Sequence, residues 1–340
     1  MSSSAMPAVE VDHLVKTYSG GRKQPDVRAL DDLSFAIPAG TVYGLLGPNG
    51  AGKSTTTKIC TTLSAATSGS ARVSGFDVRG DADAVRQHIG YVSQGTAADP
   101  RQTPMENLMM SARLRGISRP DATDRSKALL AQFDLSEAAD RKVSKLSGGM
   151  RRKLDVALGL VHSPSVLFLD EPTTGLDPEA RAEMWAEIRR LAAEKALTVV
   201  LTTHYLEEAD ELADRLVIID HGRSVIEGTP SELKATLDGD TLSVELLEPD
   251  VAAVRRAAES IPALRHVVVE ARGTSGRLFA RADDPAAIIG RVISAFDSAG
   301  IEFGAVSVSR PSLDDVYLHY AGRAYQIDAG TVDNTDKVSA

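Results

Sequence analysis

The sequence predicts an α/β protein: a core with a mostly parallel sheet, antiparallel N-terminal strands and a helical insert, followed by a small α+β domain. Near-continuous apolar runs at 166–170 and 197–203 are typical of parallel strands covered on both faces. Another strand, at 41–47, leads into a glycine-rich loop and then a helix. From residue 241 onward the order of strands and helices changes, which indicates a second domain.

The remaining elements of the core follow from local patterns. Residues 8–45 alternate short apolar runs with turn signals, which predicts antiparallel strands. Residues 104–143 are mostly helical in pattern, with a helix start at Pro120, and predict the insert. Two strands within 215–228 enclose His221 and the glycine after it, a pair typical of a hairpin turn, and end the core.

The C-terminal part has its own element order. Over residues 241–309 the pattern reads strand, helix, strand, strand, helix, strand, which is the ferredoxin-like order. A last helical segment contains LDDVYL at 313–318. Residues 324–340 are polar and rich in turn formers, which predicts disorder.

Composition limits the class of protein. The chain has 340 residues, 43% hydrophobic and 25% charged, which is typical of a globular protein with a sizeable core. A net charge of −9 argues against a nucleic-acid binder that relies on phosphate neutralisation. The single cysteine, Cys60, excludes an internal disulfide and a thiolate metal site, so we interpret it as a packing residue.

No targeting or membrane segment is predicted. The N-terminus lacks the positive start and the apolar run of a signal peptide. The most apolar stretches are far shorter than the ~20 residues that cross a bilayer. We therefore expect a chain that does not span a membrane by itself.

The strongest motif is GPNGAGKST at 47–55, which fits G-x-x-x-x-G-K-[ST] between a predicted strand and a predicted helix. Glycines let backbone N–H groups turn toward phosphates, and the helix N-terminus adds its positive dipole. Lys53 would neutralise the β- and γ-phosphates, and Ser54 would offer its hydroxyl to Mg²⁺. A chance glycine-rich turn is the alternative. The candidate nucleotide-binding residues are Gly47, Pro48, Asn49, Gly50, Ala51, Gly52, Lys53, Ser54 and Thr55.

Two adjacent carboxylates end the buried strand at 166–170. Because neighbouring strand side chains point to opposite faces, Asp170 and Glu171 should have different roles. We predict that Asp170 faces the Mg²⁺ shell and that Glu171, as a general base, polarises the attacking water. For either carboxylate alone, a plain acidic strand end is the alternative.

His204 ends the next apolar strand. It should therefore emerge at the same sheet edge, where open α/β sheets bind ligands. There its ring would hydrogen-bond the γ-phosphate of a nucleotide. The alternative is a histidine with local partners at a strand end, and His221 is interpreted only as a turn residue.

A second glycine turn stands in KLSGGMRRKL at 145–154. Apolar residues at helical spacing from 154 to 161 predict that a helix begins here, with Ser147 as its N-cap. The N-terminus of that helix is a second site for an anion. A phosphate held between two chains would use both sites, whereas a simple helix start is the alternative.

Several motifs together resemble one family. GPNGAGKST, YVSQ at 91–94, LSGGM, VLFLDEPTTGLDP and the histidine of LTTH occur in the order and spacing of ATP-binding-cassette (ABC) ATPases, over about residues 8–235. The resemblance implies ATP and Mg²⁺ as ligands. It also implies a head-to-tail dimer, in which each ATP lies between the phosphate loop of one chain and the LSGG turn of the other.

In that dimer, Ser147 and the backbone amides of Gly148 and Gly149 would contact the ATP of the partner. Met150 departs from the family, which most often has glutamine at this position. We expect ATPase activity to survive, because the phosphate contacts come from the three preceding residues.

The resemblance implies roles for three further residues. Gln94 matches the glutamine that contacts Mg²⁺ or water and links ATP to the helical insert; the alternative is a solvated loop residue. Tyr18 matches the aromatic that stacks on adenine, the alternative being a strand aromatic in the core. Asp177 matches the loop aspartate that crosses the dimer interface, the alternative being a turn or helix-capping residue. The catalytic candidates are Glu171, His204 and Gln94, and the metal candidates are Ser54, Gln94 and Asp170.

The basic run at 151–153 is interpreted as a solvated helix face, with a partner contact as the alternative. The predicted domain organisation is a flexible N-terminus at 1–7, an ABC nucleotide-binding domain at 8–235 with a helical subdomain at about 97–150, a ferredoxin-like assembly or regulatory domain at 241–322, and a disordered tail at 323–340.

Several kinds of ABC protein compete for this chain. One cassette without a membrane span fits a transporter subunit, whereas a DNA-repair ATPase would need coiled-coil heptads or zinc-binding cysteines, and a translation factor a second cassette. A simple GTPase switch would lack the LSGG turn. The chain is therefore identified as a transporter subunit.

The ferredoxin-like unit and LDDVYL resemble the ATP-binding subunits of daunorubicin-resistance drug exporters. This implies a homodimer on the cytoplasmic face of a bacterial plasma membrane, bound to a separate permease and exporting a drug. Export of lipid, polysaccharide or peptide, or a non-transport ABC ATPase, is the alternative.

Overall fold

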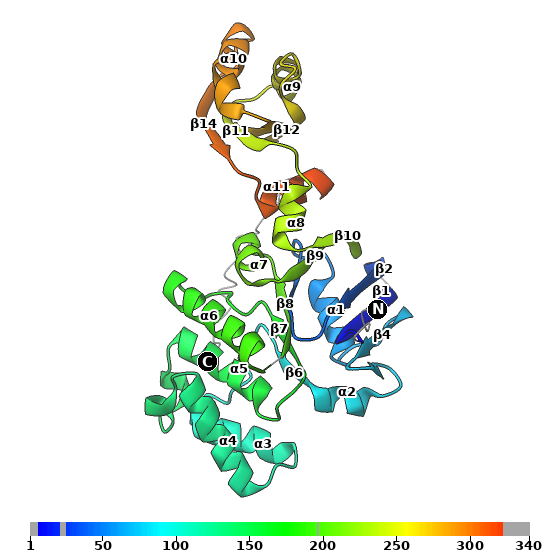
Figure 1. Cartoon of the computed structure of the whole chain (residues 1–340), viewed down its shortest axis with the longest axis vertical. Helices are drawn as coiled ribbons and strands as arrows, with labels where there is room; N and C mark the ends of the chain where they lie inside the picture. Colours follow the sequence, from blue (N-terminus) through cyan, green and yellow to red (C-terminus); the bar gives the residue numbers. More distant parts are fainter. Residues whose placement is uncertain (1–5, 21–24, 196, 322–340) are drawn as a thin grey trace, which may run out of the picture.

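The computed structural model describes residues 6–20, 25–195 and 197–321, and the chain extends along one long axis (Figure 1). A helical insert lies at one end, an α/β core lies in the middle, and a small α+β unit lies at the other end. The predicted tail at 323–340 and residues 1–5 of the predicted flexible N-terminus lie outside the described residues.

A six-stranded sheet forms the centre of the core. All neighbouring strands are parallel except for an antiparallel hairpin at one edge, where His221 and Gly222 both have positive φ, +48° and +76°. Complete burial of β3, β7 and β8 explains why their sequences are mostly apolar. The α/β prediction is thereby confirmed. In order across the sheet, the strands are β10 (Arg223–Gly228), β9 (Arg215–Asp220), β3 (Val42–Leu46), β8 (Thr198–Thr203), β7 (Val166–Asp170) and β6 (Ile89–Val92).

An antiparallel sheet near the N-terminus covers one side of this core. Its order is β2 (Val27–Ile37), β1 (Val9–Tyr18), β4 (Ser68–Val73) and β5 (Phe76–Asp77). Apolar residues of this sheet share one buried cluster with α1 (Lys53–Cys60) and with the central sheet. Cys60 belongs to that cluster, where burial raises the pKa of its thiol to about 12, so the packing interpretation is confirmed.

Helices cover the other side of the sheet and form the insert. The insert contains α3 (Pro104–Leu114), α4 (Arg119–Gln132), two short 3₁₀ turns (Ser136–Ala138 and Val143–Lys145) and α5 (Gly148–Leu160). Its apolar residues share a cluster with β7 and β8, so the insert packs directly on the strands that carry the candidate carboxylates. The other helices of the core are α2 (Ala82–His88), α6 (Pro178–Lys195), α7 (Leu206–Leu212) and α8 (Pro230–Ala235).

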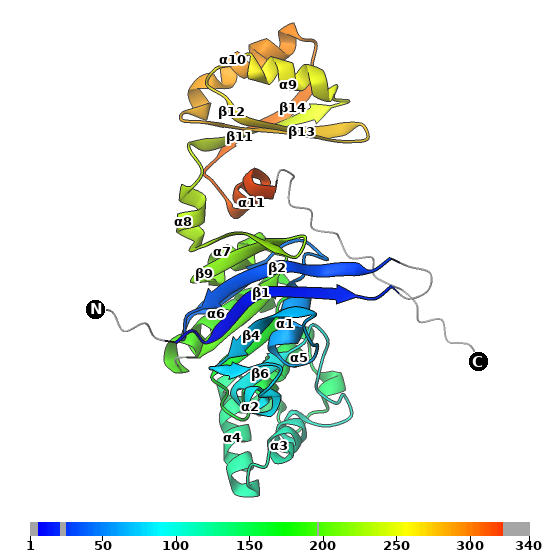
Figure 2. The same ribbon diagram turned by 90° about the vertical axis from the view of Figure 1, so that its right-hand side faces the viewer.

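The C-terminal unit has the predicted ferredoxin-like order. Along the chain its elements are β11 (Asp240–Leu247), α9 (Val251–Glu259), β12 (Arg265–Arg272), β13 (Ser275–Ala282), α10 (Pro285–Ser298) and β14 (Phe303–Ser309). The four strands form an antiparallel sheet in the order β12, β13, β11, β14. Figure 2 shows α9 and α10 on the face of this sheet that is turned away from the core.

The last helix, α11 (Leu313–Ala321), lies between that sheet and the core (Figure 2). Leu313, Val316 and Tyr317 are buried in one cluster with residues of α7, α8 and β9. On its other side, the rings of His319 and His266 meet edge to face, with centroids 4.8 Å apart. This helix therefore covers apolar surface of the core and also touches the C-terminal sheet. No helix in the described ranges is both long and apolar enough to cross a membrane.

Candidate functional site

The glycine-rich loop leaves β3 and enters α1. Gly50 and Gly52 have left-handed backbone, with φ of +80° and +111°. A Cβ on Gly52 would stand 2.6 Å from the side chain of Leu30 and 2.7 Å from the carbonyl oxygen of Ala29, so only glycine fits there. Helix α1 has no side-chain cap and no acidic residue in its first turn. Its N-terminus therefore fits an anion from outside the chain.

Lys53 lies in this loop with 5% of its surface exposed. Its Nζ donates hydrogen bonds to the carbonyl oxygens of Gly47, at 2.6 Å, and Pro48, at 3.0 Å. Burial lowers the pKa of Lys53 to about 8, although the charges of Glu171 and Asp170 act to raise it. A buried ammonium held by the carbonyls of its own loop fits a phosphate as its counterion.

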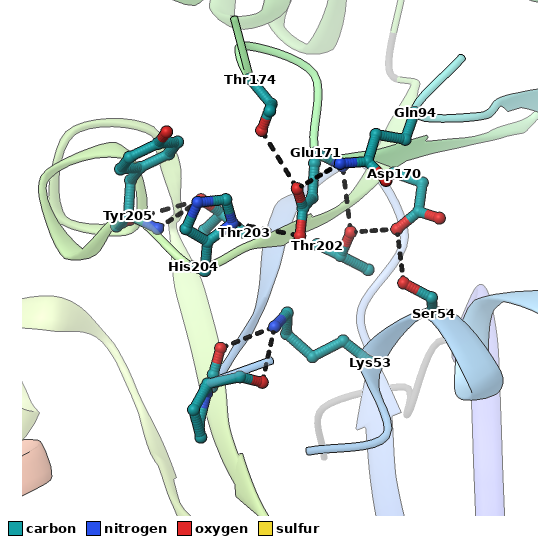
Figure 3. A network of polar contacts seen from close by, with 12 residues as sticks. Lys53, Ser54, Gln94, Asp170, Glu171, Thr174, Thr202, Thr203, His204 and Tyr205 are labelled. Atoms are coloured by element: carbon teal, nitrogen blue, oxygen red, sulfur yellow. Dashed lines mark hydrogen bonds and ion pairs between the residues drawn. The ribbon is translucent and has the colours of Figure 1, made fainter. Parts of the chain in front are cut away.

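Asp170 ends β7 directly beside β8, opposite Thr202. Its Oδ1 accepts hydrogen bonds from Ser54 Oγ, at 3.0 Å, and Thr202 Oγ1, at 2.5 Å. The structure thus brings together Ser54 and Asp170, two of the three predicted metal ligands (Figure 3). A carboxylate and a hydroxyl at the end of a phosphate loop are the oxygen donors that suit Mg²⁺, so these residues fit the ion.

Glu171, one residue later, has a different set of partners (Figure 3). Its carboxylate accepts hydrogen bonds from Gln94 Nε2, at 3.0 Å, and Thr174 Oγ1, at 3.1 Å, and lies 3.1 Å from Nδ1 of His204. Its backbone is left-handed, with φ of +48°, and its N–H donates to the carbonyl and hydroxyl oxygens of Thr202, both at 3.1 Å. Strained backbone at a non-glycine residue is often found at active sites.

The electrostatic surroundings keep Glu171 ionised. Burial alone would raise its pKa, but the contact with His204, the hydrogen bond from Thr174 and the charge of Lys53 together lower it below its ordinary value. Glu171 is therefore a carboxylate at neutral pH, which is the protonation state that a general base needs.

The histidine and the glutamine reach Glu171 from different strands. His204 follows β8 directly, is 8% exposed and stacks beside the ring of Tyr205, with centroids 4.1 Å apart. It lies at the same sheet edge as the carboxylates, where it was expected. Gln94 follows β6, two residues after Val92. Contacts of Gln94 with Mg²⁺ and of His204 with a γ-phosphate stay predictions.

The second glycine turn begins α5. Ser147 Oγ accepts a hydrogen bond from the backbone N–H of Met150, at 3.2 Å, which confirms the predicted N-cap. A Cβ on Gly148 would meet no atom within 4 Å, and the first turn of the helix has no acidic residue. The turn is thus open to solvent, while Met150 packs against the cluster of the helical insert.

Three other sequence-based assignments have mixed outcomes. Tyr18 is 40% exposed, with Lys16 Nζ 4.9 Å from its ring centroid, so the alternative of a core aromatic is wrong. Asp177 caps α6 by accepting a hydrogen bond from the N–H of Ala180, at 2.9 Å, which is its alternative assignment. The interpretation of 151–153 as a solvated helix face is wrong for Arg152, which is 7% exposed, because backbone carbonyls of two other segments surround its guanidinium.

Sequence reasoning missed four residues that shape this site. Thr174 and Thr202 contact the two carboxylates, and both stand inside motifs that were recognised, PTTG and LTTH. Arg152 and Asp155 are buried on the face of α5 that is turned toward the site. A signal for these two was their position, because charged residues at i and i+3 beside an apolar stripe can face the interior.

Known proteins resemble this chain over most of its length. The family model described as ABC transporter matches residues 30–174. The daunorubicin/doxorubicin resistance ATP-binding protein DrrA of Streptomyces peucetius is 42% identical over 322 residues, which cover 95% of this chain and 94% of the relative. The Nod factor export ATP-binding protein I of Burkholderia lata is 39% identical over 302 residues, which cover 88% of this chain and 94% of the relative.

Solved structures of ATP-binding cassettes share the fold of the core. A dimeric post-hydrolysis state of the cassette MJ0796, bound to ADP and Pi, has a TM-score of 0.59 and 26% identity, covering 65% of this chain and 98% of that one. The structure of cbiO1 from Clostridium perfringens, part of an ABC transporter complex, has a TM-score of 0.62 and 24% identity, covering 76% of this chain and 97% of that one.

Proposed function

The chain belongs to the ATP-binding proteins of ABC transporters, and from this membership we propose that it hydrolyses ATP, with Mg²⁺, to drive export of a drug through a separate permease. The observation that carries the proposal is that two adjacent carboxylates, beside a buried lysine, have different partners. Asp170 joins Ser54 of the phosphate loop, and Glu171 joins Gln94 and His204. That arrangement provides one carboxylate for a metal and one for water.

Each residue then has a distinct task. The N-terminus of α1 and Lys53 bind the phosphates, and Tyr18 stacks on adenine. Ser54, Asp170 and Gln94 would hold Mg²⁺, which supplies positive charge against the phosphate oxygens when it is bound.

Glu171 orients the attacking water and accepts its proton. His204 fixes the Glu171 carboxylate through Nδ1 and directs its other ring nitrogen to the γ-phosphate.

A second copy of the chain completes each ATP site in this proposal. Ser147, Gly148 and Gly149 contact the ATP of the partner, and Asp177 crosses the interface. Support comes from the solvent-open turn at Ser147, whose helix presents an N-terminus without acidic residues, and from the dimeric state of the related cassette MJ0796.

The cargo is proposed from the relatives that match the chain along nearly its whole length. The names of the relatives with higher identity, at 41–44%, include daunorubicin or doxorubicin. A drug of that kind is therefore the first candidate. The Nod factor export relatives, at 38–40%, support the alternative of another exported molecule. In either case the chain would lie on the cytoplasmic face of the plasma membrane, bound to its permease.

Replacing Lys53 by alanine tests the proposed ATP site. We expect ATP affinity to fall by about 10- to 100-fold, because the loss of a hydrogen bond to a charged group costs ~1.5–3 kcal/mol. Because the pKa of Lys53 is about 8 before ATP binds, wild-type affinity should also weaken as pH rises above 8, and the variant should lose this dependence. Equilibrium binding of labelled ATP between pH 7 and pH 9.5 measures both effects.

Lys58→Ala is the matched control for this variant, because Lys58 is exposed on the same helix. Cells that express the wild-type chain with its permease should accumulate less daunorubicin than cells without them. Lys53→Ala should abolish this decrease, whereas Lys58→Ala should not. Unchanged ATP affinity in Lys53→Ala would contradict the phosphate-loop assignment. If the wild-type chain binds and hydrolyses ATP but does not lower drug accumulation, the result contradicts drug export and leaves the ATPase assignment intact.

Removal of residues 241–309 tests whether the ferredoxin-like unit serves assembly rather than hydrolysis. Thr241 and Ser309 are paired across β11 and β14, so a short glycine-serine linker can join the ends. We expect basal ATPase activity to stay within about twofold and permease-coupled transport to be lost, because separate domains fold on their own cores. ATPase assays of the purified variant and transport assays in vesicles measure these results.

The deletion keeps α11, which matters for the control. Truncation after Thr236 removes α11 as well and exposes buried residues of α7 and β9, so it should lower the melting temperature more than the internal deletion does. Loss of basal ATPase activity in a folded internal deletion would show that the unit contributes to hydrolysis, contrary to the proposal.

A further inference from the structure

Arg152 makes an unusual set of contacts for a residue of a helix surface. Its guanidinium donates hydrogen bonds to four backbone carbonyl oxygens: Nη1 to Ser93, at 2.6 Å; Nη2 to Asp170, at 3.0 Å, and Glu171, at 3.2 Å; and Nε to Pro172, at 2.8 Å. The side chain is 7% exposed. One planar cation thus joins three consecutive carbonyls at the end of β7 to the residue that follows β6.

These carbonyls surround the two residues that the proposed reaction needs most. Three of them belong to Glu171 and to the residues on either side of it. The fourth belongs to Ser93, directly before Gln94, whose amide donates to the Glu171 carboxylate. Because Glu171 has left-handed backbone, its carboxylate direction depends on what holds the neighbouring peptide groups.

Asp155 acts on the same loop from the next turn of α5. It is 2% exposed, and its Oδ1 accepts hydrogen bonds from the N–H groups of Ala97, at 2.9 Å, and Ala98, at 3.2 Å. Helix α5 therefore holds the segment that contains Gln94 at two points. Arg152 binds the residue before Gln94, and Asp155 binds residues after it. The same helix begins at the Ser147 turn.

Burial of this arginine has both a cost and a gain in free energy. Removing a guanidinium from water is unfavourable, and the hydrogen bonds to four carbonyls offset part of that cost. An apolar side chain would avoid the cost of burying a charge but would offer no donor to these carbonyls. What Arg152 adds is a defined orientation of the peptide groups around Glu171 and Gln94.

We propose that Arg152 is a positioning residue for ATP hydrolysis, which holds Glu171 and Gln94 in register through their backbone while Asp155 fixes the far side of the Gln94 loop. The inference rests on the proposed function, because Glu171 must be the general base for its orientation to matter. Arg152 itself touches neither ATP nor water in this role.

The test is Arg152→Lys in the full-length chain. Lysine keeps the charge, but its compact ammonium has three donors and does not reproduce the planar contacts to four carbonyls. We expect the turnover number to fall by about 10- to 100-fold, the scale of misplacing a reacting group by about 1 Å, with ATP affinity changed by less than about threefold. Turnover is divided by the amount of chain that binds a fluorescent ATP analogue, so unfolded protein does not lower the value.

Arg151→Lys is the matched control, because Arg151 is the exposed neighbour on the same helix. Arg152→Lys is also combined with Glu171→Gln and measured in single-turnover experiments with labelled ATP. If Arg152 acts through Glu171, the double variant should hydrolyse ATP within about twofold of Glu171→Gln alone, because effects of residues that act as a unit are not additive.

Two outcomes would overturn the inference. Turnover of Arg152→Lys equal to that of Arg151→Lys would show that Arg152 positions nothing the reaction needs. An equal loss in the wild-type and Glu171→Gln backgrounds, or a loss of ATP affinity that matches the loss of turnover, would assign Arg152 a structural role. The proposed function itself fails separately, if Glu171→Gln alone keeps wild-type turnover.

Discussion

Replacement of Glu171 by glutamine should lower ATP turnover by ~10²- to 10⁴-fold, the usual contribution of general acid–base catalysis, and leave ATP affinity nearly unchanged. Glutamine has almost the same shape and keeps one oxygen to accept hydrogen bonds from Gln94 and Thr174. It cannot accept a proton from the attacking water. The loss therefore falls on the chemical step, and ATP binding through Lys53 and the phosphate loop remains.

Steady-state hydrolysis and equilibrium binding of labelled ATP, measured on the same preparation, separate these two effects. Glu137→Gln is a suitable control, since Glu137 is an exposed carboxylate in the helical insert. A parallel fall of affinity and turnover in Glu171→Gln would assign Glu171 to ATP binding. Full turnover would remove it from the mechanism.

A mixed dimer should restore activity that two single variants lack. In one chain Lys53→Ala removes the ammonium of the phosphate loop, and in the other Ser147→Arg blocks the glycine turn by bulk. Each homodimer should trap little ATP, because both of its sites are damaged. If Ser147 serves the ATP of the partner, the mixed dimer has one complete site, built from the intact Lys53 of one chain and the intact Ser147 of the other. It should trap about half as much ATP as the wild type.

Purified heterodimers that carry two different affinity tags allow this measurement, with nucleotide trapping as the main readout and ATPase activity as the second. The dimer of wild-type and Lys53→Ala chains is the control, because it also retains one complete site. If the control traps ATP and the mixed dimer traps none, the turn acts within its own chain or only caps α5, and the proposed sandwich is wrong.

Local sequence was sufficient wherever neighbouring residues decide the conformation. The loop at 47–55 depends on glycines, because a Cβ has no room at Gly52 and because Gly50 has left-handed backbone. The helix after the second glycine turn begins at the predicted cap, Ser147, which accepts a hydrogen bond from the N–H of Met150, three positions later. Strands β3, β7 and β8 were recognisable because both of their faces are covered, which makes them mostly apolar.

Contacts between distant parts of the chain needed the tertiary structure. Gln94 and Glu171 are 77 positions apart, and Ser54 and Asp170 are 116 apart. Sheet order brings each pair together, and a residue pattern within a single strand does not contain that order. The resemblance to ABC ATPases suggested that these residues share a site, but not that Gln94 and His204 both contact the Glu171 carboxylate.

By itself, the sequence determined the fold class, the phosphate loop, the two strand-end carboxylates and the helix that begins at Ser147, because each depends on a short pattern with a physical cause. Only the tertiary structure decided what lies opposite a side chain. Arg152 looked like part of a solvated basic run, yet carbonyls from β7 and the Gln94 loop surround it. Likewise, α11 covers the core because its apolar residues meet those of α7, α8 and β9 there. Burial is a property of the assembled surroundings, and the same charged or apolar residue is stable inside or outside according to the partners that the fold brings to it.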